Sequence, residues 1–237
     1  MSTSPTGARP ARLLVMDVDS TLIAQEVIEL LADHAGTREQ VAAVTERAMR
    51  GEIDFAASLR ERVATLEGVP VEAFADVRRR ATFTAGAPEL VAEARRRGWE
   101  VGLVSGGFEE VVAPLAAELG ITLYRANRLE ASGGRLTGRT IGPVVDRAAK
   151  AATLLDFAAR LGVEPEDTIA VGDGANDLDM IAAAGVGIAF AAKPLVRRQA
   201  PYAVDGPRLD AVLDVVDRAD AARRQVEDVR PAAGPRR

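Results

Sequence analysis

Short apolar runs alternate with helix-like periodic segments along most of the chain. Five runs rich in Val, Ile and Leu and bounded by Gly, Asp or Ser predict buried parallel strands, at 12–17, 99–107, 121–126, 167–174 and 185–190. Segments with apolar residues at helical spacing separate most of them, at 88–97, 108–119, 147–161 and 176–184. This alternation predicts an α/β fold with a doubly wound, mostly parallel sheet.

Two segments depart from the alternation. Between 25 and 84 no strand-like run occurs, and apolar residues such as Val27 and Leu31 recur at helical spacing. About sixty helical residues are too many for an ordinary crossover connection, so we expect an inserted α-helical cap. The segment 128–142 reads instead as a small β-hairpin that turns at Ser132–Gly134.

These patterns predict the domain organisation. We expect an α/β core made of 11–24 and 85–221, and a helical cap made of 25–84. Residues 1–10 are mostly Ser, Thr, Pro, Gly and Arg, and the chain ends in a similar composition at 222–237. We expect both terminal segments to be disordered tails.

Composition and charge exclude several classes of protein. Of the 237 residues 48% are hydrophobic, enough for a sizeable core, whereas only 4% are aromatic, too few for a platform that stacks bases. With a net charge of −5, the protein as a whole does not attract nucleic acid or anionic lipid electrostatically. The lack of cysteine excludes metal sites with thiolate ligands. No apolar run has the length of a membrane span, and the N-terminus lacks a signal-peptide pattern. We expect a cytoplasmic monomer or homodimer that binds neither nucleic acid nor membrane.

Acidic residues gather where predicted strands end. The stretches "DVDST" and "GDGANDLD" follow two of the strands and carry Asp17, Asp19, Asp173, Asp177 and Asp179. Because open α/β sheets bind ligands beyond the carboxyl ends of their strands, several of these carboxylates are expected to converge. Clustered carboxylates repel one another unless a proton or cation lies among them, and an all-oxygen site suits Mg²⁺. Taken singly, each Asp could equally be a turn residue or a helix N-cap.

Lysine usage marks one further candidate. Lys and Arg total 30 residues, yet Lys150 and Lys193 are the only lysines. A compact ammonium can neutralise a phosphate or a carboxylate where a guanidinium fork is too large. The alternative is chance retention of a lysine on a solvated helix face.

Four features resemble, in order, the motifs of the haloacid dehalogenase superfamily of aspartate-nucleophile phosphatases: "DVDSTL", "VSGGF", Lys150 and "VGDGANDLDM". Similarity to the phosphoserine phosphatase family extends from around Leu13 to Leu213, and includes "STLIAQEVIELLADHAG", "FAASLRERV", "ANRLEASGGRLTG" and "AFAAKP". The resemblance implies a Rossmann-like core with a helical cap. It also implies Mg²⁺-dependent hydrolysis of O-phospho-L-serine to L-serine and phosphate, the last step of serine biosynthesis.

The resemblance assigns the chemistry to the acidic motif residues. Asp17 is expected to attack phosphorus and form an aspartyl-phosphate, while Asp19 acts as general acid and then general base. Residues two apart in an extended strand point to the same side, so both carboxylates can face one phosphoryl group. Mg²⁺ is expected to bind Asp17, the backbone carbonyl of Asp19 and Asp173, and to reach Asp177 through water.

The same resemblance implies how the phosphate group is held. Ser105 and the amide of Gly106 match the phosphate cradle, at a turn from strand to helix that can bind anions. Lys150 matches a lysine that contacts both phosphate and nucleophile, and Asn176 a polar residue near the phosphate.

Four residues of the cap segment match positions that select the substrate. Glu26 is expected to bind the ammonium of phosphoserine and Arg62 its carboxylate, while Met49 and Phe55 close over the site. Singly, Glu26 could be an acid in a first helical turn, Arg62 a solvated arginine, and the two apolar residues ordinary core.

The sequence is compatible with two other functions. One is a phosphatase or phosphotransferase of the same fold that acts on another small phosphomonoester, for example with homoserine as phosphate acceptor. The other is a catalytically silent, phospho-accepting regulatory module.

Overall fold

A central β-sheet organises the chain, and the computed structural model describes residues 10–229. Within that range the strands form one seven-stranded sheet with the order β4-β3-β2-β1-β5-β6-β7. All neighbouring strands are parallel except β3 and β4. The strands are β1 (Leu13–Met16), β2 (Glu100–Phe108), β3 (Leu123–Ser132), β4 (Arg135–Ile141), β5 (Thr168–Gly172), β6 (Val186–Phe190) and β7 (Tyr202–Val204).

Helices cover both faces of the sheet because the strand side chains are apolar on both sides. Leu14 and Met16 pack in one cluster with α5 (Ala87–Arg96), α6 (Glu109–Glu118) and α10 (Val212–Val229). Leu13 and Val15 pack on the opposite face with α7 (Arg147–Leu161) and α8 (Leu178–Ala183). A short helix, α9 (Pro194–Gln199), follows β6. The predicted doubly wound α/β fold is confirmed.

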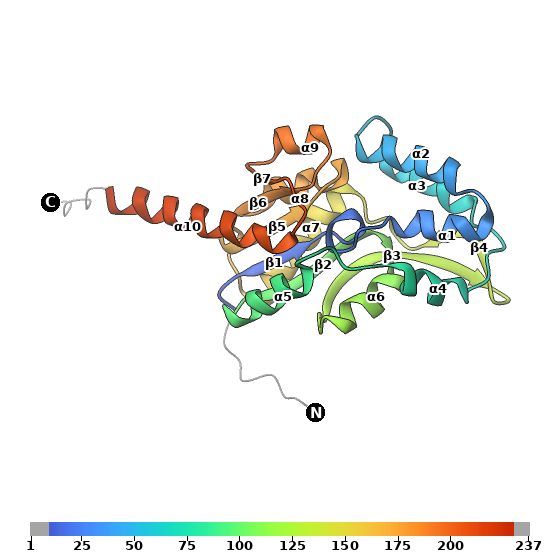
Figure 1. The fold of residues 1–237 in the computed structure, drawn as a ribbon, viewed down its shortest axis with the longest axis horizontal. Coiled ribbons are helices and arrows are strands. Elements are labelled where there is room, and N and C mark those ends of the chain that lie inside the picture. The colour runs from blue at the N-terminus through green and yellow to red at the C-terminus, as the bar shows by residue number, and fades with distance from the viewer. Residues whose placement is uncertain (1–9, 230–237) are drawn as a thin grey trace, which may run out of the picture.

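The predicted helical insertion lies between β1 and α5. A tight turn (Val18–Leu22) leads from β1 into α1 (Val27–Ala35), α2 (Arg38–Met49), α3 (Phe55–Ala64) and α4 (Ala73–Arg80). Figure 1 shows these four helices gathered at one end of the molecule, beside β4. The two connections to the core run together, since Ala24 N donates to Thr82 O at 3.0 Å and Thr84 N donates to Leu22 O at 2.9 Å.

The predicted hairpin is present, but β3 enters it directly from the main sheet as one long strand. Its turn, Gly133–Gly134, has φ values of 59° and 77°, which favour glycine. The hairpin also contacts the inserted helices, because Gly68 N donates to Leu136 O at 2.9 Å and Leu136 N donates to Val69 O at 2.8 Å. The hairpin therefore belongs spatially to the helical insertion as much as to the sheet.

One expectation about the C-terminal segment is wrong. We expected 222–237 to be disordered, but α10 continues to Val229, so the expectation is wrong for 222–229. The guanidinium of Arg223 donates to Glu166 O at 2.8 Å and to Gly185 O at 2.6 Å, which holds the helix against the core. The expectations for 1–9 and 230–237 lie outside the described residues. Among the helices of residues 10–229, none combines the length and the apolar character that crossing a membrane requires.

Candidate active site

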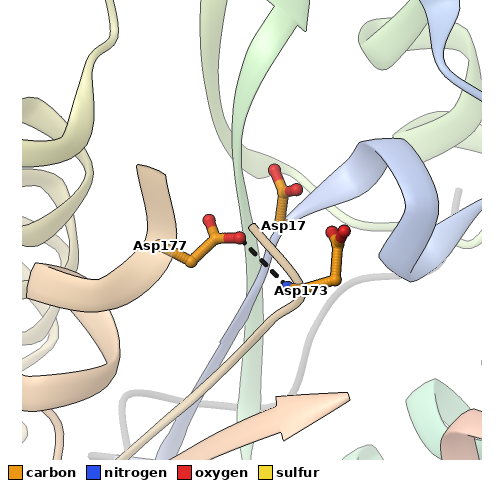
Figure 2. Close-up of side chains that lie close together, drawn as sticks. All are labelled: Asp17, Asp173 and Asp177. Carbon is orange, nitrogen blue, oxygen red and sulfur yellow. Dashed lines mark hydrogen bonds between the residues drawn. The ribbon is translucent and has the colours of Figure 1, made fainter. Parts of the chain in front are cut away.

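Three buried carboxylates meet where β1 and β5 end side by side. Asp17 follows β1 and Asp173 follows β5, and Asp17 N donates to Val171 O at 2.9 Å across the two strands. Each of Asp17, Asp173 and Asp177 offers an oxygen within 4.8 Å of the others. Figure 2 shows the three side chains gathered in one place. The convergence expected at the carboxyl ends of the strands therefore occurs.

Lys150 supplies the positive charge of this cluster. It lies in the first turn of α7 and is fully buried, with Nζ 2.6 Å from Oδ1 of Asp17 and 2.6 Å from Oδ1 of Asp177. Burial by itself lowers the pKa of Lys150, but the two carboxylates outweigh it and raise the pKa above its ordinary value. Lys150 therefore stays charged beside Asp17.

Asp177 acts as a support for its neighbours. One oxygen accepts from Lys150, and the other accepts from the backbone N–H groups of Asp173 at 3.1 Å and Gly174 at 3.0 Å. Gly172 makes room for it, since a Cβ added there would overlap the side chain of Asp177. With both oxygens engaged, Asp177 holds the lysine and the loop that carries Asp173.

The charge balance of the cluster fits a divalent cation. Burial raises the pKa of Asp17 to about 7, with Asp177 adding to the effect and Lys150 opposing it. Burial and the charge of Asp177 also raise the pKa of Asp173 well above its usual range. One ammonium faces three buried carboxylates, so the protein neutralises only part of their charge. An all-oxygen donor set with excess negative charge can bind a hard metal ion.

Asp19 reaches the same site through the turn after β1. Ser20 takes a φ of 57°, and the Asp19 carboxylate accepts from Val27 N at 3.3 Å. A Cβ added to Gly107 would lie 2.6 Å from Oδ2 of Asp19, so a larger residue there would displace the Asp19 carboxylate. Burial, then the charges of Glu26 and Asp17, raise the pKa of Asp19 well above its usual range, which suits a group that starts protonated.

The predicted phosphate cradle is an irregular part of β2. The register between β2 and β3 shifts between Val104 and Phe108, and Gly107 N donates to Oγ of the fully buried Ser105 at 2.8 Å. Phe55 of α3 covers Gly106, because a Cβ added there would lie 2.7 Å from Cζ of Phe55. The cradle therefore lies directly beneath the helical insertion.

A small pocket lies between the core and the inserted helices. It leaves only about 20 Å³ of free space, which is room for a water molecule and too little for phosphoserine. The Oδ1 atom of Asn176, one of its lining residues, is buried without a hydrogen-bond partner among residues 10–229. Eight of the predicted site residues line the pocket: Asp17, Asp19, Glu26, Met49, Phe55, Arg62, Gly106 and Asn176. The other four, Ser105, Lys150, Asp173 and Asp177, are buried and lie outside the lining.

Groups of opposite charge line this pocket. Glu26 accepts from Oγ of Ser20 at 2.7 Å, and burial raises its pKa. Arg62 is 3% exposed, and its guanidinium donates to Oγ1 of Thr45 at 3.0 Å and to Ser58 O at 3.1 Å. Burial lowers the pKa of Arg62, and the charge of Glu26 opposes that shift. A carboxylate and a guanidinium in one pocket suit a ligand that carries both an ammonium and a carboxylate.

Several supporting residues were not identified from the sequence. Thr21 donates from Oγ1 to Oδ1 of Asp173 at 3.1 Å, while Thr45 and Ser58 hold Arg62. Thr21 lies within "DVDST", so the motif itself was a signal. Thr45 and Ser58 carry no comparable signal, because their role depends on how α2 and α3 pack.

Comparison with known proteins gives concordant matches. The haloacid dehalogenase-like hydrolase family matches residues 14–182. Phosphoserine phosphatase of Streptococcus thermophilus is 55% identical over 205 residues, which cover 86% of this chain and 95% of that protein. Two other curated relatives are longer proteins, and the alignment with this chain covers 56% of one and 50% of the other.

Solved structures agree with these sequence matches. A substrate-bound phosphoserine phosphatase complex superposes with a TM-score of 0.85 at 39% identity, covering 88% of this chain and 99% of that one. A phospho-aspartyl intermediate analogue of phosphoserine phosphatase superposes with a TM-score of 0.84 at 40% identity, covering 87% and 99%.

Proposed function

Because the chain belongs to the haloacid dehalogenase-like hydrolases and, within them, to the phosphoserine phosphatases, we propose that it hydrolyses O-phospho-L-serine to L-serine and phosphate. One observation carries the proposal: the same small pocket is lined by the two motif carboxylates, Asp17 and Asp19, and by the oppositely charged Glu26 and Arg62. The first pair suits phosphoryl transfer and the second suits the amino-acid part of the substrate.

The proposed reaction has two steps at Asp17. Its carboxylate attacks phosphorus and the bond from phosphorus to the serine oxygen breaks, while Asp19 gives its proton to that oxygen. Asp19 then takes a proton from water, the water oxygen attacks the aspartyl-phosphate, and phosphate leaves with Asp17 restored. The raised pKa of Asp19 supports its start as an acid, and the Lys150 ammonium 2.6 Å from Asp17 offsets negative charge at the nucleophile.

We propose Mg²⁺ as the metal, held by Asp17, the backbone carbonyl of Asp19 and Asp173. When bound, it offsets the repulsion between the anionic nucleophile and the phosphate dianion. Asp177 would be reached only through water, and the engagement of both its oxygens by Lys150 and by backbone amides supports that placement.

Substrate recognition divides between the core and the helical insertion. In this proposal Ser105, the amide of Gly106, Lys150 and Asn176 bind the phosphate group. Glu26 binds the ammonium and Arg62 the carboxylate, while Met49 and Phe55 cover the site and exclude water. The pocket is too small for the substrate as it stands, so the inserted helices must move to admit it.

The wider assignments are also proposals. We place the core at 11–24 and 85–221, extended to the end of α10 at 229, and the cap at 25–84. The helices α1 to α4 support this division because all four lie within the cap. We propose that the protein works in the cytoplasm, in the last step of serine biosynthesis, as a monomer or homodimer without nucleic-acid or membrane partners.

A panel of phosphorylated metabolites, assayed with Mg²⁺ and with homoserine as a possible acceptor, tests the proposal. Phosphoserine should give the highest kcat/KM, or be among the highest, with release of inorganic phosphate. A clearly better phosphomonoester, or transfer to homoserine in place of hydrolysis, would refute the substrate assignment. Absence of turnover with every compound would favour the silent regulatory module.

A further inference from the structure

Asn127 is a buried polar residue of β3 that the mechanism does not use. It is 2% exposed and lies where β2 and β3 lose their regular register. Val104 pairs with Arg125 and Phe108 pairs with Asn127. Between these two pairs β2 advances by four residues, whereas β3 advances by only two. The segment Ser105–Gly107 therefore bulges out of the ladder, and its backbone needs another partner.

The side chain of Asn127 provides that partner. Its Nδ2 donates to Gly106 O at 2.8 Å, while Gly107 N donates to Ser105 Oγ at 2.8 Å. The peptide unit between the two glycines is thus held at its oxygen and at its N–H. Glycine has the least restricted dihedral angles of all residues, so these two bonds limit how this peptide unit, and with it the adjoining Gly106 amide, can rotate.

The other end of the same amide reaches a second part of the site. Oδ1 of Asn127 accepts from Val145 N at 2.7 Å. Val145 immediately precedes Asp146, the N-cap of α7, whose side chain accepts from Ala149 N at 2.9 Å. Lys150 follows in the first turn of that helix, so Asn127 links the bulge of β2 to the helix that carries the buried ammonium.

We propose that Asn127 is a positioning residue, which fixes the β2 bulge relative to the start of α7 so that the Gly106 amide and Lys150 converge on one phosphoryl group. This inference rests on the proposed function, because it assumes that the two groups bind the same phosphate. Asn127 itself does not line the pocket and acts through the groups that it holds.

The chain offers a matched control at Thr168. Thr168 is fully buried at the start of β5, where its Oγ1 donates to Pro165 O at 2.6 Å and accepts from Gly185 N at 3.2 Å. Like Asn127, it donates one hydrogen bond to a backbone carbonyl and accepts one from a backbone N–H. It lies where β5 begins, whereas the site lies where the strands end. Thr168→Val removes both bonds without touching the site.

The experiment compares Asn127→Leu, Asn127→Asp and Thr168→Val by kcat, by affinity for inorganic phosphate and by thermal midpoint. Asn127→Asp keeps the side-chain shape and the acceptor for Val145, so it serves if Asn127→Leu fails to fold. We expect both Asn127 variants to lose about tenfold to a hundredfold in kcat and to bind phosphate more weakly. Thr168→Val should change both quantities less than about twofold at a temperature where it is folded.

Two results separate the possible failures. Asn127 variants that lose thermal stability but keep the kcat and phosphate affinity of Thr168→Val would overturn the positioning role. If the unmodified protein does not hydrolyse phosphoserine, the proposed function fails instead. Phosphate affinity then still decides whether Asn127 positions the cradle.

Discussion

The ammonium of Lys150 lies 2.6 Å from the carboxylate of Asp17, and the two residues are 0% and 4% exposed. They lie 133 positions apart in the chain, and α7 and β1 bring them together. Burial raises the carboxylate pKa whereas the ammonium lowers it, so the ion pair favours the ionised form that a nucleophile needs. Most of the expected behaviour of the site depends on this contact.

Lys150→Met should reduce kcat with phosphoserine by about a hundredfold or more, because it removes the fixed positive charge beside the nucleophile and the phosphate. It should also lower the free energy of unfolding, since Asp17 and Asp177 lose their shared partner. Steady-state kinetics and urea unfolding measure the two effects. Arg147→Met is the control, because Arg147 lies on the exposed side of α7 and pairs there with Asp179 of α8. A kcat for Lys150→Met equal to that of the control would contradict this role.

Metal affinity should rise with pH. In the metal-free protein burial raises the pKa of Asp17 to about 7 and that of Asp173 well above its usual range. A cation binds the ionised forms, so protons compete with it below those pKa values and are released on binding. Calorimetric titration with Mg²⁺ should give a dissociation constant at about pH 8 that is at least tenfold lower than at about pH 6. An affinity independent of pH would show that the carboxylates are already ionised.

Arg62→Leu should alter substrate preference more than catalysis. Loss of the guanidinium removes the partner of the substrate carboxylate, which we expect to lower kcat/KM for phosphoserine by about tenfold to a hundredfold. Phosphoethanolamine lacks that carboxylate, so its kcat/KM should change much less. Arg60→Leu, at an exposed position of the same helix, should change neither value. An equal loss with both substrates would remove Arg62 from carboxylate recognition.

The site residues that lie at strand ends or within motifs could be predicted from the sequence. Asp17 and Asp173 converge because parallel strands end at one edge, a consequence of the alternating pattern alone. The scarcity of lysine indicated Lys150, which is buried at the centre of the charge cluster. It also drew attention to Lys193, whose Nζ lies 2.7 Å from Oε2 of Glu46 in α2 and so joins the core to the inserted helices.

The remaining features depend on tertiary contacts that a pattern does not encode. Asn127 gains its role only because β2 bulges beside it, and the hairpin pairs with Val69 only once the helical insertion has folded against it. The end of α10 was missed for a different reason. Polar composition suggested disorder, but Arg223 bonds the backbone of the core and the helix continues.

Turnover by Asp17→Asn is the most direct test of the account, because every proposed step begins or ends at that carboxylate. The substitution keeps the shape of the side chain and removes the nucleophilic oxygen, so phosphate release from phosphoserine with Mg²⁺ should fall by about a thousandfold or more. The thermal midpoint should stay the same or rise, since Lys150 keeps Asp177 as its partner and the repulsion among three buried carboxylates decreases. A folded Asp17→Asn variant that releases phosphate as fast as the unmodified protein would contradict the covalent route.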